Sequence, residues 1–192
     1  SLPTVGKGSM QNREDTRLYG RNEEVAMWYP DQNKPSYKKL GQYCAEKQIS
    51  IDTFSCYSID EKKKETTIHG SSPSNFIDVA TVGLLSKLTG GETLRFQSFS
   101  QKNKRQIARF NRDILRILTG TVAFEAVLKV RCSEGLRPVA IHGSGIPKSN
   151  SEVNIPVVNE DTAFCATFDF TQDLADIEST AYIQVSFLYT TM

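Results

Sequence analysis

The chain has 192 residues, of which 39% are hydrophobic and 23% are charged. These proportions are ordinary for a soluble globular protein, and they exclude a disordered, collagen-like or coiled-coil chain as an overall description. The 23 Lys and Arg residues nearly balance the 22 Asp and Glu residues, which argues against a domain devoted to nucleic acid.

No stretch of the sequence reaches the roughly 20 apolar residues that a membrane-spanning helix needs. The chain begins Ser-Leu-Pro-Thr, with neither an initiator Met nor a signal-peptide pattern, so we expect a fragment of a longer protein. Its cysteines form no Cys-x-x-Cys pair, and no Asn-x-Ser/Thr acceptor occurs. These features favour a reducing, cytosolic compartment in which the cysteines are small buried side chains. The four cysteines are Cys44, Cys56, Cys132 and Cys165.

The first 57 residues predict the end of a strand, a helix and a second strand. Leu2–Val5 is typical of a strand that runs into a loop, and the polar segment after it predicts irregular structure up to Pro35. Ser36 can cap a helix, because apolar residues then recur at helical spacing as far as Gln48. Ile49–Phe54 is rich in β-branched and aromatic residues and predicts a strand directly after this helix.

A charged segment separates this strand from the next helix. Ser58–Asn75 combines a Glu-Lys-Lys-Lys-Glu run with Gly, Ser and Pro, which predicts a solvated loop and the most mobile part of the chain. Asp78–Leu88 has apolar residues at helical spacing and predicts a helix. Gly90 ends it, since glycine accepts the left-handed conformation just past a helix. Glu92–Phe99 predicts the next strand.

The clearest helical pattern covers Asn103–Leu118, and Gly120 closes it. Apolar residues gather on one side of this helix and arginines on the other. We expect four apolar side chains to be buried, namely Ile107, Phe110, Ile114 and Leu118. We expect four cationic side chains to be largely exposed, namely Arg105, Arg109, Arg112 and Arg116.

The alternation of helices and strands before Gly120 predicts an α/β domain with a parallel sheet, and further strands of that sheet are expected upstream. After Gly120 the pattern is all β. Strands are predicted at Phe124–Cys132, Leu136–His142, Phe164–Phe170 and Ala181–Tyr189, as in part of a β-sandwich. The predicted fold class is therefore α/β followed by all-β, with one domain over residues 1–119 and a second over residues 120–192.

Motifs that would indicate an active site are weak. Gly6-Lys7-Gly8-Ser9 lacks the upstream glycine and the hydroxyl residue directly after the lysine that a phosphate loop needs, so an ordinary turn is favoured. His142-Gly143-Ser144-Gly145 is not a nucleophile elbow. His69 and His142 are the only histidines, no cluster has metal-ligand spacing, and Glu125 is expected to face solvent. We predict no catalytic and no metal-binding residue.

Two groups of cations remain. The arginine side of the predicted helix 103–118 is either a solvated face or a patch that meets an acidic partner or anionic lipid headgroups. Lys129 and Arg131 project from the same side of a predicted strand, about 7 Å apart, because alternate residues of a strand share a face. Two such cations can bind a carboxylate or an acidic peptide side chain. The alternative is an ordinary exposed sheet face.

Five ordered blocks of this sequence resemble the cargo-adaptor subunit of the COPII vesicle coat. They are Ser1–Gly6, Arg13–Leu18, Tyr37–Leu40, Asp78–Gly91 and Phe124–Cys132. The resemblance implies the second half of the family's trunk, a von Willebrand A-like α/β domain, followed by part of its β-sandwich. Ser58–Asn75 departs from the family pattern and is interpreted as a lineage-specific insertion.

The resemblance also implies a function. The family consists of non-enzymatic adaptors that select cargo and SNARE tails leaving the endoplasmic reticulum and pair with a sibling subunit that activates a Sar-type GTPase. It implies a cytoplasmic protein that is peripheral on the endoplasmic reticulum membrane and on COPII vesicles. No cofactor is expected in this part of the chain, because the family's zinc ribbon would lie upstream.

The resemblance finally implies a binding site. Two arginines of the family's Arg-Val-Arg stretch help to bind acidic export signals, and the matching positions here are Lys129 and Arg131. The lysine is a departure, since an ammonium cannot form the bidentate fork of a guanidinium. The alternative function is a metal-dependent von Willebrand A adhesion domain. It needs an Asp-x-Ser-x-Ser loop, which does not occur in this sequence.

Overall fold

The computed structural model describes residues 4–13, 15–31, 33–57, 77–171 and 180–191. The predicted loop Ser58–Asn75, including His69, lies outside the described residues. The chain divides into two compact units. Unit 1 comprises residues 1–40, 52–85 and 92–120, and unit 2 comprises residues 41–51, 86–91 and 121–192. The division of the chain into domains 1–119 and 120–192 remains a prediction.

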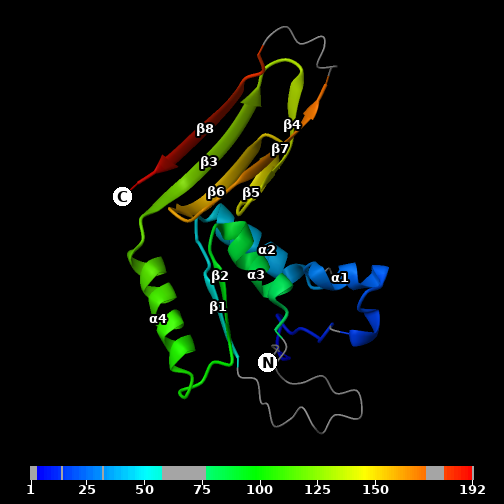
Figure 1. The fold of residues 1–192 in the computed structure, drawn as a ribbon, viewed down its shortest axis with the longest axis vertical. Coiled ribbons are helices and arrows are strands. Elements are labelled where there is room, and N and C mark those ends of the chain that lie inside the picture. The colour runs from blue at the N-terminus through cyan, green and yellow to red at the C-terminus, as the bar shows by residue number, and fades with distance from the viewer. Residues whose placement is uncertain (1–3, 14, 32, 58–76, 172–179, 192) are drawn as a thin grey trace. The chain divides into compact units, whose positions relative to one another are not determined.

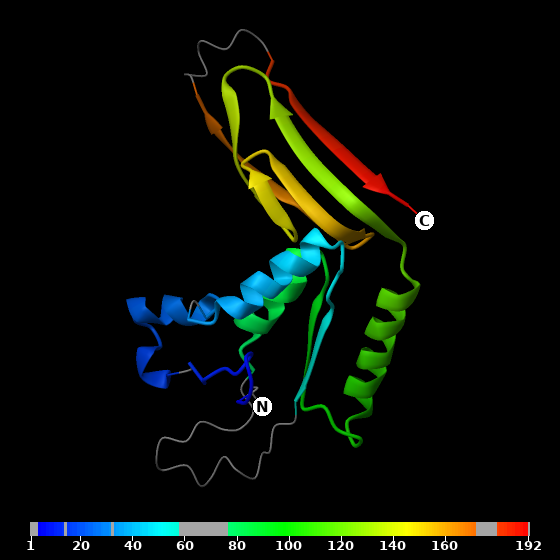
Figure 2. The same cartoon turned by 180° about the vertical axis from the view of Figure 1, so that it is seen from behind.

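Unit 1 is built on a two-stranded parallel sheet (Figure 1). Strand β1 (Thr53–Tyr57) pairs in parallel with β2 (Thr93–Gln97), as the alternating pattern predicted. Helix α4 (Lys104–Thr119) lies along one side of these strands, and the first part of α3 (Val79–Thr89) lies on the other (Figures 1 and 2). The parallel sheet between crossover helices is the α/β half of the predicted fold class.

The remaining helices precede this sheet. They are the short 3-10 helices η1 (Thr16–Leu18) and η2 (Asn22–Glu24), then α1 (Val25–Trp28) and α2 (Pro35–Glu46). The first three occur in the segment that the sequence predicted to be irregular, and none of them exceeds four residues. Of the strand predicted at Leu2–Val5, only Thr4 and Val5 are described, and neither is in a strand.

The strand predicted at Ile49–Phe54 begins four residues late. Gln48 takes a left-handed conformation (φ 58°), and the Ile49 amide donates to the Cys44 carbonyl at 2.9 Å. This pair of features closes a helix C-terminus in the Schellman manner. Ile49 is therefore used to finish α2, and the strand starts only at Thr53.

Aromatic packing anchors α4 in unit 1. The helix begins at the predicted place, where the Asn103 side chain accepts from the Gln106 amide. The Phe110 ring centroid lies 6.0 Å from that of Phe54 and 5.1 Å from that of Phe96, both edge-on. The expectation of four buried side chains on this helix is wrong, however. Ile107, Phe110 and Ile114 are only half-buried. Leu118 is 77% exposed.

Unit 2 contains a four-stranded antiparallel sheet with strand order β5-β6-β3-β8. A separate antiparallel pair is formed by β4 and β7. The strands are β3 (Val122–Cys132), β4 (Leu136–His142), β5 (Ile146–Ser149), β6 (Glu152–Asn159), β7 (Cys165–Phe170) and β8 (Ile183–Thr190). Four of the six were predicted, whereas β5 and β6 were missed. These strands are the all-β part of the predicted fold class.

The core of unit 2 lies on one face of the four-stranded sheet. It consists of Ala126, Leu128, Val153, Ile155 and Val158. Ile141 of β4 and Phe164, just before β7, pack against these residues, so the β4–β7 pair covers this face in the manner of a sandwich. Strand β8 is an edge strand whose described residues are all exposed.

Two further expectations can be compared with the described residues. Cys44 is buried, but Cys56 and Cys165 are exposed, so the prediction of four buried cysteines is wrong. Among the described helices, none is long and apolar enough to cross a membrane.

Candidate functional site

Strand β3 places Lys129 and Arg131 on the same side. Leu128, just before Lys129, and Val130, between the two cations, point to the opposite side and are buried. This alternation fixes the direction of both cations, because neighbouring strand residues point to opposite faces. The Lys129 side chain is 40% exposed and Arg131 is exposed.

The neighbouring strands complete this side of the sheet, which we call the outer face. Cross-strand partners of an antiparallel pair share a face, so the register identifies its members. They are Val127, Lys129 and Arg131 of β3, Glu152 and Asn154 of β6, and Gln184, Ser186 and Leu188 of β8. The outer face thus combines charged residues with an exposed apolar side chain, since Leu188 is 73% exposed.

Lys129 forms an ion pair within the outer face. Its Nζ lies 3.1 Å from Oε2 of Glu152, its partner on β6. Lys148 of β5 donates to the other oxygen of the same carboxylate at 2.8 Å. The pKa of Glu152 lies below its ordinary value. The hydrogen bond from Lys148 is the largest cause, and the one from Lys129 is the second.

Arg131 differs from Lys129 in its contacts. Within the part of the chain that the structure describes, its guanidinium forms no ion pair, and its cross-strand partner is the uncharged Gln184. Two hydrogen bonds fasten β8 to β3 just past this position. The Ser133 amide donates to the Tyr182 carbonyl at 2.9 Å, and the Tyr182 amide donates to the Ser133 hydroxyl oxygen at 3.0 Å.

A bulge at the start of β3 precedes this site. Glu125 has a φ of 54°, and the register with β8 shifts between Phe124 and Val127. One extra residue in β3 opposes its partner there, as in a β-bulge. Glu125 is exposed, as expected, and the strand regains regular alternation before Lys129.

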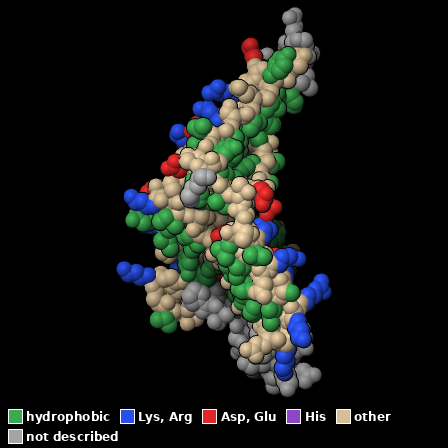
Figure 3. All heavy atoms as spheres, turned by 90° about the vertical axis from the view of Figure 1, so that its left-hand side faces the viewer, with side chains coloured by type: hydrophobic (Ala, Val, Ile, Leu, Met, Phe, Trp, Pro, Cys, Tyr) green, Lys and Arg blue, Asp and Glu red, His purple; other side chains and the backbone are tan. Residues whose placement is uncertain are grey.

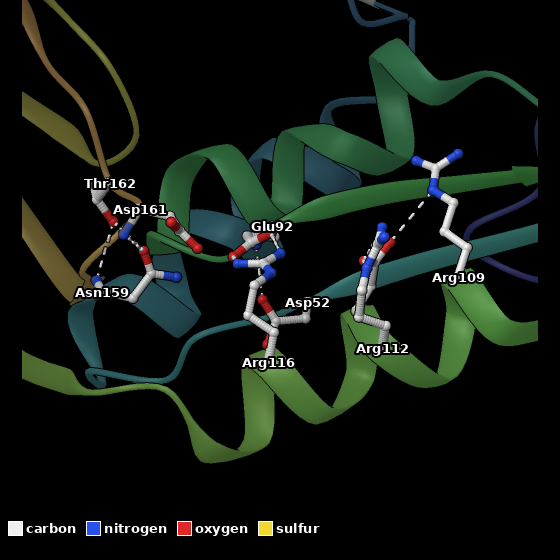
Figure 4. Close-up of polar contacts among 9 residues, drawn as sticks. Asp52, Glu92, Arg109, Arg112, Arg116, Asn159, Asp161 and Thr162 are labelled. Atoms are coloured by element: carbon white, nitrogen blue, oxygen red, sulfur yellow. Dashed lines mark hydrogen bonds and ion pairs between the residues drawn. The ribbon is translucent and has the colours of Figure 1, made fainter.

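The arginines of α4 are the second group of predicted cations. Arg105, Arg109 and Arg112 are exposed, whereas Arg116 is half-buried. Arg116 Nη1 donates to Glu92 at 2.9 Å, and the Glu92 amide donates to Asp52 at 2.7 Å (Figure 4).

A buried carboxylate on α4 pairs with two of the other arginines. Asp113 accepts two hydrogen bonds from Arg112 and lies 3.4 Å from Nε of Arg109. The Arg109 guanidinium also lies 5.3 Å from the centre of the Phe96 ring. Because Asp113 belongs to α4 itself, its ion pairs stay within the helix. The contact between Arg109 and Phe96 joins α4 to β2, which the wheel pattern did not predict. On the surface of unit 1 that carries α4, hydrophobic side chains lie beside cations (Figure 3).

The remaining motifs form local structure. The Ser9 amide donates to the Gly6 carbonyl at 3.0 Å, which makes the Gly6-Lys7-Gly8-Ser9 segment a turn, as predicted. His142 ends β4 and is exposed. The described residues contain no group of three or more His, Cys, Asp and Glu side chains that could hold a metal ion.

Glu152 was not identified from the sequence. It lies at the start of β6, a strand that was missed although Val153 and Ile155 alternate with polar residues there. That alternation, next to the Lys148-Ser149-Asn150-Ser151 turn, is the signal from which a hairpin could have been predicted.

Two family models match segments at the two ends of the chain. A family model described as the Sec23/Sec24 trunk domain matches residues 1–60, and one described as the Sec23/Sec24 beta-sandwich domain matches residues 123–192. Among similar proteins, "Protein transport protein SEC24 A" of Arabidopsis thaliana is 29% identical over 191 residues. "Protein transport protein Sec24D" of Homo sapiens is 28% identical over 193 residues.

A solved structure agrees with these sequence matches. The chain is similar to the crystal structure of the human COPII-coat protein Sec24c, with a TM-score of 0.80 and 28% identity over 100% of this chain and 23% of that one. The match to the Arabidopsis relative includes 99% of this chain but only 16% of that protein. The match to human Sec24D includes 100% of this chain and 17% of that protein. The resemblance noted in the sequence is therefore confirmed, and the chain belongs to the Sec23/Sec24 family as a trunk segment followed by a β-sandwich segment.

Proposed function

We propose that this chain is part of a non-enzymatic COPII coat adaptor that selects cargo and SNARE export signals at the endoplasmic reticulum. The proposal is supported by the similarity of the whole of this chain to a segment of Sec24 proteins and of a COPII-coat structure. In this role the parent protein is cytoplasmic and peripheral on the membrane. It pairs with the sibling GTPase-activating subunit and so depends indirectly on a Sar-type GTPase.

The single observation that carries the binding role is the pair of cations on the outer face. Lys129 and Arg131 project from alternate positions of β3, and the buried residues between them hold the strand in place. A guanidinium that meets a carboxylate forms a charge-assisted hydrogen bond, which contributes about 1.5–3 kcal/mol. An acidic side chain of an export signal is therefore the ligand that this face would bind.

The outer face also offers an apolar contact for such a signal. Leu188 lies opposite Val127, two positions along β3 from Lys129. A peptide with a hydrophobic residue near its acidic residue could contact Leu188 and the cations together. This arrangement supports a short, mixed acidic and hydrophobic signal rather than a purely acidic one.

Reconstitution of the coat tests the proposed role of the parent protein. The full-length protein and its sibling subunit are mixed with liposomes that carry the GTP-loaded Sar-type GTPase, and both subunits are expected to sediment with the liposomes. Omitting the GTPase is the control and should leave both in the supernatant. Failure of the two subunits to associate, or sedimentation that does not depend on the GTPase, would contradict the proposal.

The alternative, a metal-dependent adhesion domain, predicts a different result. Titration of the full-length protein with Mg²⁺ in a calorimeter should then give the heat of stoichiometric binding. If the adaptor proposal is right, residues 1–192 contribute no Mg²⁺ site, and the titration shows no heat of Mg²⁺ binding to them.

A further inference from the structure

We propose that Glu152 is an internal competitor for Lys129, a carboxylate that occupies this cation until an acidic ligand displaces it. The inference rests on the proposed function of the outer face and adds a residue that limits its affinity. On this view, an incoming carboxylate contacts Arg131 first. It contacts Lys129 only after it displaces Glu152 from that lysine.

The geometry of Glu152 supports the competition. Its two carboxylate oxygens are taken by different lysines, Oε2 by Lys129 at 3.1 Å and Oε1 by Lys148 at 2.8 Å. The Glu152 side chain is only 14% exposed, whereas Lys129 is 40% exposed and Lys148 is 65% exposed. The Glu152 side chain is thus less exposed than the side chain of either lysine that contacts it.

Arg131 has no such competing carboxylate among the described residues. It lies two residues beyond Lys129 on the same face, and among the described residues no carboxylate forms an ion pair with it. A carboxylate that reaches the outer face therefore meets one uncommitted cation, Arg131, and one committed cation, Lys129. The two cations are unequal because of their neighbours as well as because of their chemistry.

Displacement of Glu152 from Lys129 exchanges one ion pair for another, so the ligand gains little from this cation. The negative charge of Glu152 would also lie close to the incoming carboxylate and repel it. Lys148 makes the exchange possible, because Glu152 keeps one lysine when Lys129 turns to the ligand. The triad of Lys129, Glu152 and Lys148 can therefore open without leaving a charge unpaired.

Removal of the Glu152 charge tests this inference. The affinity of the full-length protein for a synthetic peptide with two acidic residues is measured at low salt for wild type and for Glu152→Gln. We expect the variant to bind about two- to fivefold more tightly, as for the release of one surface ion pair. Glu160→Gln, which removes the same charge from the turn at the other end of β6, is the matched control and should leave the affinity unchanged.

Lys129→Ala adds a test of mechanism. In the wild-type background it should change the affinity less than twofold, because Glu152 already occupies this cation. In the Glu152→Gln background it should remove most of the gain. Thermal melting of each variant shows whether it is folded.

The outcomes separate this inference from the proposed function. Unchanged or weaker binding by Glu152→Gln, with binding still lost in Arg131→Ala, would overturn the competitor role and leave the adaptor site standing. An equal gain in Glu160→Gln would also overturn it, because the effect would then be one of net charge. Unchanged binding in Arg131→Ala would overturn the proposed site itself.

Discussion

Gly90 lies against the backbone carbonyl of Val157, at a place where a side chain would overlap that carbonyl. Gly90 has a φ of 81°, and the next amide, that of Gly91, donates to the Ser86 carbonyl at 3.0 Å. This is a Schellman closure of α3, which the sequence predicted from Gly90. The glycine thus ends the helix and lets β6 approach its end within unit 2.

Gly90→Ala should lower the free energy of unfolding by more than the cost of the left-handed conformation alone, which is about 1–2 kcal/mol. The additional loss comes from the contact with the Val157 carbonyl. Gly20→Ala is the matched control, since Gly20 has a similar φ of 74° and no atom within 4 Å of the added methyl group. Chemical denaturation of both variants measures the difference, and equal losses would contradict the role of the contact.

Phe110→Ala should destabilise unit 1 by about 3 kcal/mol, the lower end of the range for a buried aromatic residue, because Phe110 is half-buried. The variant removes ring contacts with Phe54, Phe96 and Phe99. Leu118→Ala on the same helix should cost less than about 0.5 kcal/mol, because Leu118 is largely exposed. A larger loss for Leu118→Ala than for Phe110→Ala would show that α4 is rotated from the orientation described.

Lys148→Ala should raise the pKa of Glu152, because the hydrogen bond from Lys148 is the largest cause of its lowering. A carboxyl group with a lowered pKa stabilises the folded state above its ordinary pKa of 4.5, and this contribution is lost as the pH falls through the lowered value. The variant should therefore lose less stability than wild type as the pH falls through this window.

An NMR titration of the Glu152 carboxyl carbon measures this pKa directly. Lys148→Arg is the control, since a guanidinium can replace the hydrogen bond and keep the pKa low. An unchanged pKa in Lys148→Ala would mean that Lys129 alone holds the carboxylate.

Much of the fold follows from local sequence signals. The helix α4, with Asn103 before it and Gly120 after it, and the strand β3 were predicted nearly to their ends. Both have strong periodicity and clear end residues, which depend little on the rest of the chain. Strand β1 was predicted to begin too early because Gln48, and not a glycine, takes the left-handed conformation that ends α2. Without a glycine at this position, the sequence contains no signal for the end of the helix.

The candidate site was only partly predictable. The direction of Lys129 and Arg131 follows from alternation along one strand, but their charged neighbours depend on which strands lie beside β3. Glu152 reaches Lys129 through the β3–β6 pairing, which joins residues 23 positions apart and leaves no local pattern. The prediction that Arg116 is exposed failed for the same reason, because Arg116 contacts Glu92, which a helical wheel of α4 does not contain.

The role of Arg131 is tested by the affinity of the full-length protein for an acidic export-signal peptide, compared between wild type and Arg131→Ala. The variant is expected to bind about ten- to a hundredfold more weakly, the equivalent of one charge-assisted hydrogen bond, and the difference should shrink as salt rises. Arg137→Ala, which removes an exposed arginine paired with Asp169 on the β4–β7 sheet, should bind as wild type does. Wild-type affinity in Arg131→Ala, or an equal loss in Arg137→Ala, would contradict the claim.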